Sequence, residues 1–319
     1  MKRTIILIVM ILLLVTGCSD NKQINETEKN DGKIKVSTST YPMYYIAKEI
    51  GKDNIDLNIL VPMGVDPHEY ELSLKETKKL EDTDLLLYNG SGLEHWGEKI
   101  SDNLKEKNKS VINASEYVEL LKVEDNDHEA SDDNGEEDHD DHVHGEKDPH
   151  IWLDPINMDK VAKAFSEELK KLDEKNSDIY EANYKELSEK LKNLDDKYSE
   201  ALKNKKDNTI LVSHRAFAYL AHRYNLNQIA VTGISPHSEP SPKSISKLID
   251  MTRDKNIKHI FFEVLSSPKS VEMIAEEAKL EVLILNPIGG ITKEQFESDV
   301  DYIDLMEENL ENLKKALVD

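Results

Sequence analysis

Asp148-Pro149-His150-Ile151-Trp152-Leu153-Asp154-Pro155 lies between an acidic, histidine-containing run and a strongly helical region. Because proline disfavours the α conformation of the preceding residue, the first proline predicts an extended backbone. The second proline suits the first turn of the helix that follows. His150 is therefore expected in a restrained, non-helical segment. Such a segment can orient a metal ligand, or it can simply pack the imidazole beside Trp152 in a core.

Two further histidines occur in similar settings, each just after a predicted strand. His68 follows a strand predicted at residues 56–61, and His214 follows one predicted at 209–212. In open α/β sheets, ligands bind at the carboxyl ends of strands. The recurrence of this setting favours a metal site over a packed core histidine at position 150.

Apolar runs of strand length alternate with helical patterns along most of the chain. The strands are expected at residues 34–38, 56–61, 85–88, 110–113, 209–212, 228–231, 259–264 and 282–285. The helices are expected at residues 41–50, 73–80, 156–172, 216–224, 244–255 and 268–279, with one closing helix that carries Phe296, Val300, Ile303, Met306, Leu310, Leu313 and Leu317. This alternation predicts α/β architecture with parallel sheets.

A longer helix is expected at residues 177–204, between the two halves of this pattern. Its apolar residues recur at steps of three or four, and it contains no glycine or proline. A helix of this length spans roughly 40 Å. We interpret it as a rigid strut between two α/β domains, with an ordinary surface helix of one domain as the alternative.

The chain is strongly acidic, with a formal net charge of −23 over 319 residues. This charge argues against nucleic acid and against an anionic membrane surface as partners, and it suits a protein that handles cations. The only cysteine is Cys18. No disulfide can therefore form within the chain, and a zinc site in its folded part must use nitrogen and oxygen ligands.

The first 18 residues have the features of an export signal. Lys2-Arg3 precede an apolar run at residues 5–15, which is too short to cross a membrane comfortably. The run ends in a sequence that resembles a bacterial lipobox, which implies cleavage before Cys18 and lipid attachment to its sulfur. An ordinary signal with a chance cysteine is the alternative. Residues 19–32 are polar and are interpreted as a flexible tether, so we expect a lipid-anchored protein on the extracytoplasmic face of the cell membrane.

Residues 124–148 interrupt the α/β pattern with thirteen Asp and Glu against one Lys. The run also contains His128, His139, His142 and His144. Because it has no apolar periodicity, it predicts a disordered surface loop. Its composition is typical of weak, multi-site metal capture, and a solvated acidic insertion with no role is the alternative.

Several motifs together have a familiar arrangement. They are Pro67-His68, the His-rich acidic insertion, the stretch from Asp148 to Pro155, Ser213-His214 with Ala216-Phe217, Ser238-Glu239-Pro240-Ser241-Pro242 and Phe261-Phe262-Glu263. This set resembles the zinc branch of the cluster A-I substrate-binding lipoproteins of metal ABC transporters. The resemblance implies an N-terminal domain at 33–176, a linking helix at 177–204 and a C-terminal domain at 205–319, with the metal in the cleft between the domains.

The resemblance also implies a ligand set for Zn²⁺. His68 and His150 would come from the first domain and His214 from the second, whereas manganese-type relatives have Glu at the last position. Many zinc relatives add a Glu from an Asn-Pro-Ile-x-Gly loop, but this chain has Gly289 there. We therefore expect water as the fourth ligand.

Other polar residues near these motifs receive different interpretations. Glu263 is expected to orient an imidazole and not to bind the metal, and His237 is a further candidate for the fourth position. We expect structural roles for His95, His222 and His259.

The sequence thus predicts a monomeric protein that captures zinc and delivers it to a membrane permease, without performing a reaction. A manganese-binding member of the same family is one alternative, and a surface adhesin is another. A lipid-anchored zinc hydrolase is a further alternative, because three histidines and an open position also make catalytic zinc. The chain lacks the His-Glu-x-x-His motif of many such hydrolases.

Deleting residues 125–147 should leave tight zinc binding unchanged and should remove only weak additional binding. The reason is that so polar a loop has nothing to order it. Calorimetry of the deleted and full-length chains compares the two classes of site. A large loss of tight-site affinity would instead identify a loop histidine as a direct ligand.

Overall fold

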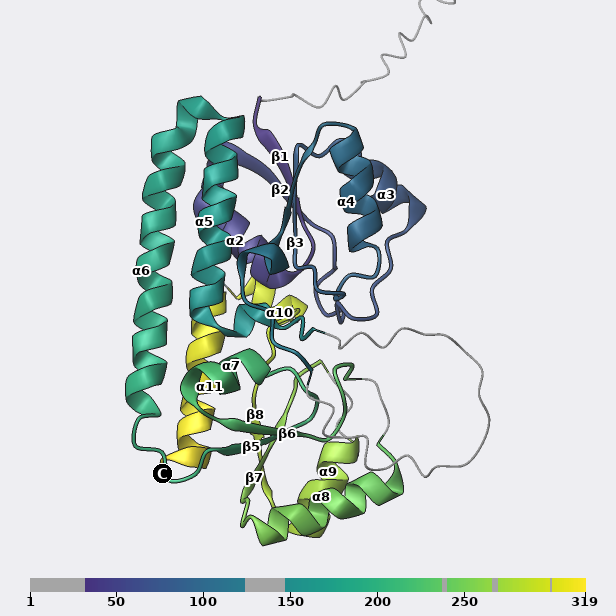
Figure 1. Ribbon diagram of the computed structural model, residues 1–319, viewed down its shortest axis with the longest axis vertical. Coiled ribbons are helices and arrows are strands. Elements are labelled where there is room, and N and C mark those ends of the chain that lie inside the picture. The colour runs from purple at the N-terminus through teal and green to yellow at the C-terminus, as the bar shows by residue number, and fades with distance from the viewer. Residues whose placement is uncertain (1–31, 124–146, 237–239, 266–268, 299) are drawn as a thin grey trace, which may run out of the picture. The chain divides into compact units, whose positions relative to one another are not determined.

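The structure is a computed structural model that describes residues 32–123, 147–236, 240–265, 269–298 and 300–319 (Figure 1). Several predictions lie outside these residues: the export signal with Cys18, the tether, the four histidines of the insertion, and His237. Within the described residues, no helix has the length and apolar character needed to cross a membrane.

The described residues contain two four-stranded sheets, and every strand pair in them is parallel. The first sheet has the order β2-β1-β3-β4 and consists of β1 Ile34–Thr38, β2 Ile55–Ile59, β3 Leu85–Tyr88 and β4 Ser110–Asn113. The second has the order β6-β5-β7-β8 and consists of β5 Thr209–Val212, β6 Asn227–Ala230, β7 His259–Phe262 and β8 Glu281–Ile284. The predicted fold class, two parallel-sheet α/β units joined through a long helix, is confirmed.

Helices surround both sheets at nearly the predicted places. In the first half they are α2 Tyr41–Gly51, α3 Leu74–Leu80, α4 Gly97–Glu106, α5 Pro155–Leu172 and α6 Ser177–Ala201. In the second half they are α7 Ala218–Tyr224, α8 Pro242–Asp254, α9 Lys269–Ala278, α10 Lys293–Glu297 and α11 Tyr302–Leu317. Short 3₁₀ turns η1 Lys52–Asn54, η2 Ala114–Tyr117, η4 Ile151–Leu153 and η5 Glu174–Asn176 connect some of these elements.

Strand β3, in the interior of the first sheet, is buried on both faces. Successive side chains of a strand point to opposite faces. Leu85 and Leu87 therefore join the cluster formed with α2, α5 and α6. Leu86 and Tyr88 join a second cluster with α3 and α4. All four residues are buried, which explains the uninterrupted apolar run in the sequence.

Helix α6 connects the two halves through packing along its length. It has 25 residues, a span of about 38 Å, and it lies beside α5 (Figure 1). Near its middle Lys190 pairs with Glu49 of α2 at 2.9 Å, and closer to its end the Tyr198 hydroxyl donates to the Met306 carbonyl of α11 at 2.6 Å. One continuous apolar cluster contains residues of β1, α6 and α11, and contacts join residues 34–319 into one compact unit.

The prediction of a single closing helix is wrong, because the structure contains two helices there. Helix α10 ends at Glu297, and α11 begins at Tyr302. Asp301 is the N-cap of α11: its side chain accepts from the Asp304 amide at 3.0 Å, and the Asp304 side chain accepts from the Asp301 amide at 3.1 Å. This reciprocal capping box satisfies two amides at a helix start, so the chain begins a new helix at this point.

Asp301→Ala should lower the free energy of unfolding by about 1 kcal/mol, because it removes the acceptor that caps α11. Asp301→Asn should keep most of this stability, since the Asn side chain caps about as well as Asp. Denaturant unfolding of the two variants and the parent measures the difference. Equal stability of the Ala and Asn variants would contradict the assignment of this cap.

Candidate metal centre

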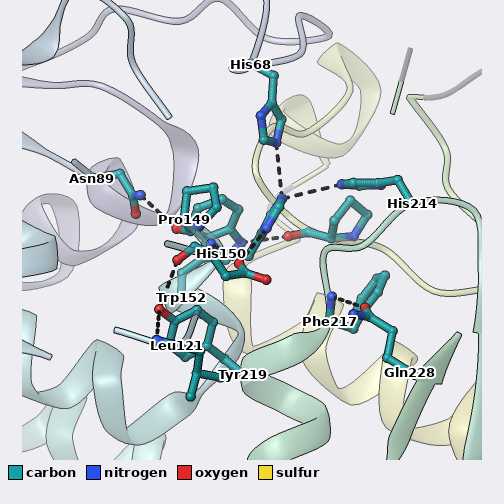
Figure 2. Close-up of polar contacts among 12 residues, drawn as sticks. His68, Asn89, Leu121, Pro149, His150, Trp152, His214, Phe217, Tyr219 and Gln228 are labelled. Carbon is teal, nitrogen blue, oxygen red and sulfur yellow. Dashed lines mark hydrogen bonds and ion pairs between the residues drawn. The ribbon is translucent and has the colours of Figure 1, made fainter. Parts of the chain in front are cut away.

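Three imidazoles converge between the two sheets. His68 lies in the loop after β2, His150 immediately precedes η4, and His214 follows β5 (Figure 2). The Nε2 atom of His150 lies 3.1 Å from Nε2 of His68 and 3.4 Å from Nε2 of His214. One ligand atom of each residue lies within 4.8 Å of the others. The structure thus brings together the three histidines that the sequence singled out.

These spacings suit a small cation bound by all three nitrogens. Zinc–nitrogen bonds of about 2.0–2.1 Å in a tetrahedron place neighbouring ligand atoms roughly 3.3 Å apart. The two closest nitrogen–nitrogen distances, 3.1 and 3.4 Å, bracket this value. The cavity that the histidines line has a volume of about 30 Å³, which is room for a single ion or water molecule.

A repeated local motif orients two of the histidines. In both Asp66-Pro67-His68 and Asp148-Pro149-His150, the Asp Oδ1 atom accepts from the His backbone amide at 2.8 Å. This is the Asx turn that Asp forms with the residue two positions later. Asp148 Oδ1 also lies 2.9 Å from Nδ1 of His150 and thereby directs Nε2 of that ring into the site. This role of Asp148 was not predicted, although the repeated Asp-Pro-His motif in the sequence indicates it.

Glu263 performs the corresponding task for the third histidine. Its Oε1 atom accepts from the His214 amide at 3.1 Å and from the Ser213 hydroxyl. Its Oε2 atom lies 2.5 Å from Nδ1 of His214, a close contact without hydrogen-bond geometry. Glu263 is only 3% exposed. Both of its oxygens are therefore engaged on the side of the ring opposite Nε2.

The loop after β3 supports the segment that carries His150. The Asn89 side-chain amide donates to the Pro149 carbonyl at 2.8 Å (Figure 2). Glu94 holds this loop, because its two carboxylate oxygens accept from the amides of Asn89 and Gly90 at 2.9 and 3.0 Å. Burial raises the pKa of Glu94 above its usual value, an effect that these bonds partly offset.

Gly289 lines the same cavity and supplies no side chain to it. The neighbouring Pro287 carbonyl accepts from the indole nitrogen of Trp152 at 2.6 Å, which ties this loop to the His150 segment. A Cβ atom built at Gly289 would lie 3.2 Å from the Trp152 ring and 3.3 Å from the Pro67 ring. The space for a side chain here is therefore tight by a few tenths of an ångström.

The remaining described histidines lie apart from this cluster. His95 and His222 are exposed, and His259 lies 3.6 Å from Glu281 at the edge of the second sheet. Across the described ranges, His68, His150 and His214 form the one group of three or more potential ligands within binding distance.

Comparisons with known proteins agree on one family. The model of the family described as zinc-uptake complex component A, periplasmic (ZnuA), matches residues 36–316. The chain is 34% identical over 306 residues to the high-affinity zinc uptake system protein ZnuA of Bacillus subtilis. The aligned residues cover 96% of this chain and 94% of that protein.

A second group of relatives is longer than this chain. The chain is 33% identical over 318 residues to the zinc-binding lipoprotein AdcA of Streptococcus pneumoniae, covering 99% of itself but only 61% of AdcA. The crystal structure of the Zn(II)-bound ZnuA-like domain of that AdcA superposes with a TM-score of 0.76 at 31% identity, covering 89% of this chain and 99% of that domain.

Gly289→Glu should bind zinc about tenfold more tightly than Gly289→Ala, the equivalent of about 1.4 kcal/mol. Both variants introduce the crowded Cβ atom, but only Glu adds a carboxylate to the cavity that the histidines line. Competition with a zinc chelator measures both affinities, and stopped-flow transfer to the chelator should show slower release from the Glu variant. Equal affinities would show that a side chain at this position does not reach the metal.

Proposed function

The chain belongs to the ZnuA family of zinc-uptake complex components, and from this premise we propose that it captures Zn²⁺ outside the cytoplasm and delivers it to an ABC-transporter permease. The observation that carries the proposal is the convergence of three imidazole nitrogens at spacings that suit a tetrahedral ion. In this proposal His68, His150 and His214 are the zinc ligands. The ion is cargo, so the protein must both bind it and release it.

The donor atoms favour zinc over manganese. Imidazole nitrogen suits zinc, whereas carboxylate, carbonyl and water oxygens suit manganese. Both oxygens of Glu263 and the Oδ1 atom of Asp148 contact backbone amides and the Nδ1 sides of the rings. They are therefore proposed as groups that orient the ligands. Since Gly289 offers no side chain, we propose water as the fourth ligand, which leaves one position that exchanges easily.

The same placement of carboxylates supports a binding protein over a zinc hydrolase. A hydrolase needs a base within reach of the water on the metal. The carboxylates of Asp148 and Glu263 contact the two imidazoles from the Nδ1 side, away from the converging Nε2 atoms. Neither is placed to take a proton from a water between the three histidines.

We also propose where the protein works and how it is divided. The lipobox-like sequence that ends at Cys18 supports a lipid anchor on the outer face of the cell membrane, and the relative AdcA is named a lipoprotein. Each half contains its own four-stranded parallel sheet, which supports domains at 33–176 and 205–319 joined by the helix at 177–204. We propose that the protein works as a monomer.

Replacing His68, His150 or His214 singly with Ala should weaken zinc binding by more than the 10–100-fold that loss of an orienting partner typically costs. Each substitution removes one of three direct bonds, whereas the exposed His222→Ala variant should bind zinc like the parent. Calorimetry with zinc measures affinity, and thermal unfolding without metal checks the fold.

The proposed ligand set is wrong if all three single variants bind zinc as tightly as the parent. The same titrations with Mn²⁺ should give much weaker binding to the parent chain, because imidazole nitrogen binds zinc in preference to manganese. Tighter binding of manganese than of zinc would favour the manganese alternative.

A further inference from the structure

The segment that carries His150 is held by side chains from elements far away in the sequence. Three of its backbone carbonyls accept hydrogen bonds from side chains. The acceptor–donor pairs are Asp148 with the Tyr219 hydroxyl at 2.9 Å, Pro149 with Asn89 at 2.8 Å and Trp152 with the Tyr302 hydroxyl at 2.6 Å. Two of the three donors belong to the second half of the chain. The position of His150 therefore depends on the half that also supplies His214.

Tyr219 contacts the residue whose carboxylate orients His150. It is 3% exposed, and its hydroxyl donates to the Asp148 carbonyl while accepting from the Leu121 amide at 3.1 Å (Figure 2). The Asp148 amide in turn donates to the Leu121 carbonyl at 3.0 Å. The hydroxyl thus satisfies two buried backbone groups, and one of them belongs to the residue whose carboxylate orients His150.

The chain segment between His214 and Tyr219 is short, and hydrogen bonds hold its backbone. Helix α7 begins four residues after His214, and between them the Ala216 amide donates to the His214 carbonyl at 2.9 Å. The Phe217 amide donates to the Gln228 side chain at 2.6 Å (Figure 2). These two bonds leave few residues unbraced between His214 and the Tyr219 hydroxyl, which contacts the His150 segment.

We propose that Tyr219 is a positioning residue of the metal centre, which holds His150 at the correct distance from His214 through the Asp148 carbonyl. The inference rests on the proposed role of these histidines as zinc ligands. The Nε2 atoms of the two rings lie 3.4 Å apart, and zinc–ligand distances tolerate little error. Loss of the hydroxyl leaves the Leu121 amide and the Asp148 carbonyl without this partner, so the segment must shift or admit water.

Tyr219→Phe tests the proposal, and Tyr224→Phe is a matched control on the same helix. Tyr224 is also buried, and its hydroxyl donates to Asp195 of α6 at 3.0 Å, a contact outside the metal cavity. Each variant removes one buried, hydrogen-bonded phenol oxygen and keeps the ring. A general loss of stability should therefore affect both variants similarly.

Tyr219→Phe should weaken zinc binding by about 10–100-fold, the usual effect of removing a group that orients a ligand. Tyr224→Phe should leave zinc affinity unchanged. Chelator competition with the full-length chain measures affinity, and thermal unfolding without metal measures stability. The visible absorption of the Co²⁺-loaded forms provides a second readout, and it should change only in Tyr219→Phe because the ligand geometry changes there.

The proposal is overturned if Tyr219→Phe binds zinc as tightly as the parent and gives the parental Co²⁺ spectrum. It is equally overturned if both variants lose the same affinity, because the effect is then general destabilisation. These outcomes differ from failure of the proposed function, which would show as absence of tight zinc binding by the parent chain.

Discussion

The structure depends on holding three imidazole nitrogens close together with their lone pairs or protons directed at one another. At 3.1 and 3.4 Å, two nitrogens that both present lone pairs, or that both present protons, repel each other unless a cation lies among them. Hydrogen bonds hold the three residues in place despite this repulsion. The backbone amides of His68, His150 and His214 each donate to a carboxylate. Two of those carboxylates also contact the Nδ1 atom of the same ring. A cation between the rings is attracted by the lone pairs that the three nitrogens direct at it.

The topology of the sheets explains why the required groups meet. In a parallel sheet, the carboxyl ends of neighbouring strands lie at the same edge. Strands β5 and β7 are neighbours, with Val212 opposite Phe261. The residues that follow these strands, Ser213-His214 and Glu263, therefore arrive side by side, although they are about fifty positions apart in the sequence. Strand β5 is thus followed by a proposed ligand, and strand β7 by the group that orients it.

This topology also decides how much the sequence could predict. Strand ends and local motifs identified His68, His150 and His214, and Glu263 as an orienting group, because those signals lie within a few residues of each other. The role of Asp148 was accessible by the same means, through the repeated Asp-Pro-His motif. The Tyr219 contact was not accessible, because its acceptor lies 71 positions earlier and nothing local to Tyr219 indicates it. The break before α11 was missed because the apolar pattern continues across a capping box.

The carboxylate charges lie apart from the proposed ligand nitrogens, and this arrangement suits an ion that must be released. In the proposed site, three neutral imidazoles would bind the ion through nitrogen, while the carboxylates of Asp148 and Glu263 lie behind the rings. The negative charges thus stabilise a bound dication at a distance without bonding to it. Release then breaks bonds to neutral ligands only, which separates less charge at close range than breaking a direct carboxylate bond. A site with the same two carboxylates turned inward would hold a dication through anionic oxygen and would favour harder metals. The outward orientation of these two groups, fixed by their bonds to backbone amides, is therefore what would make the proposed centre a nitrogen site.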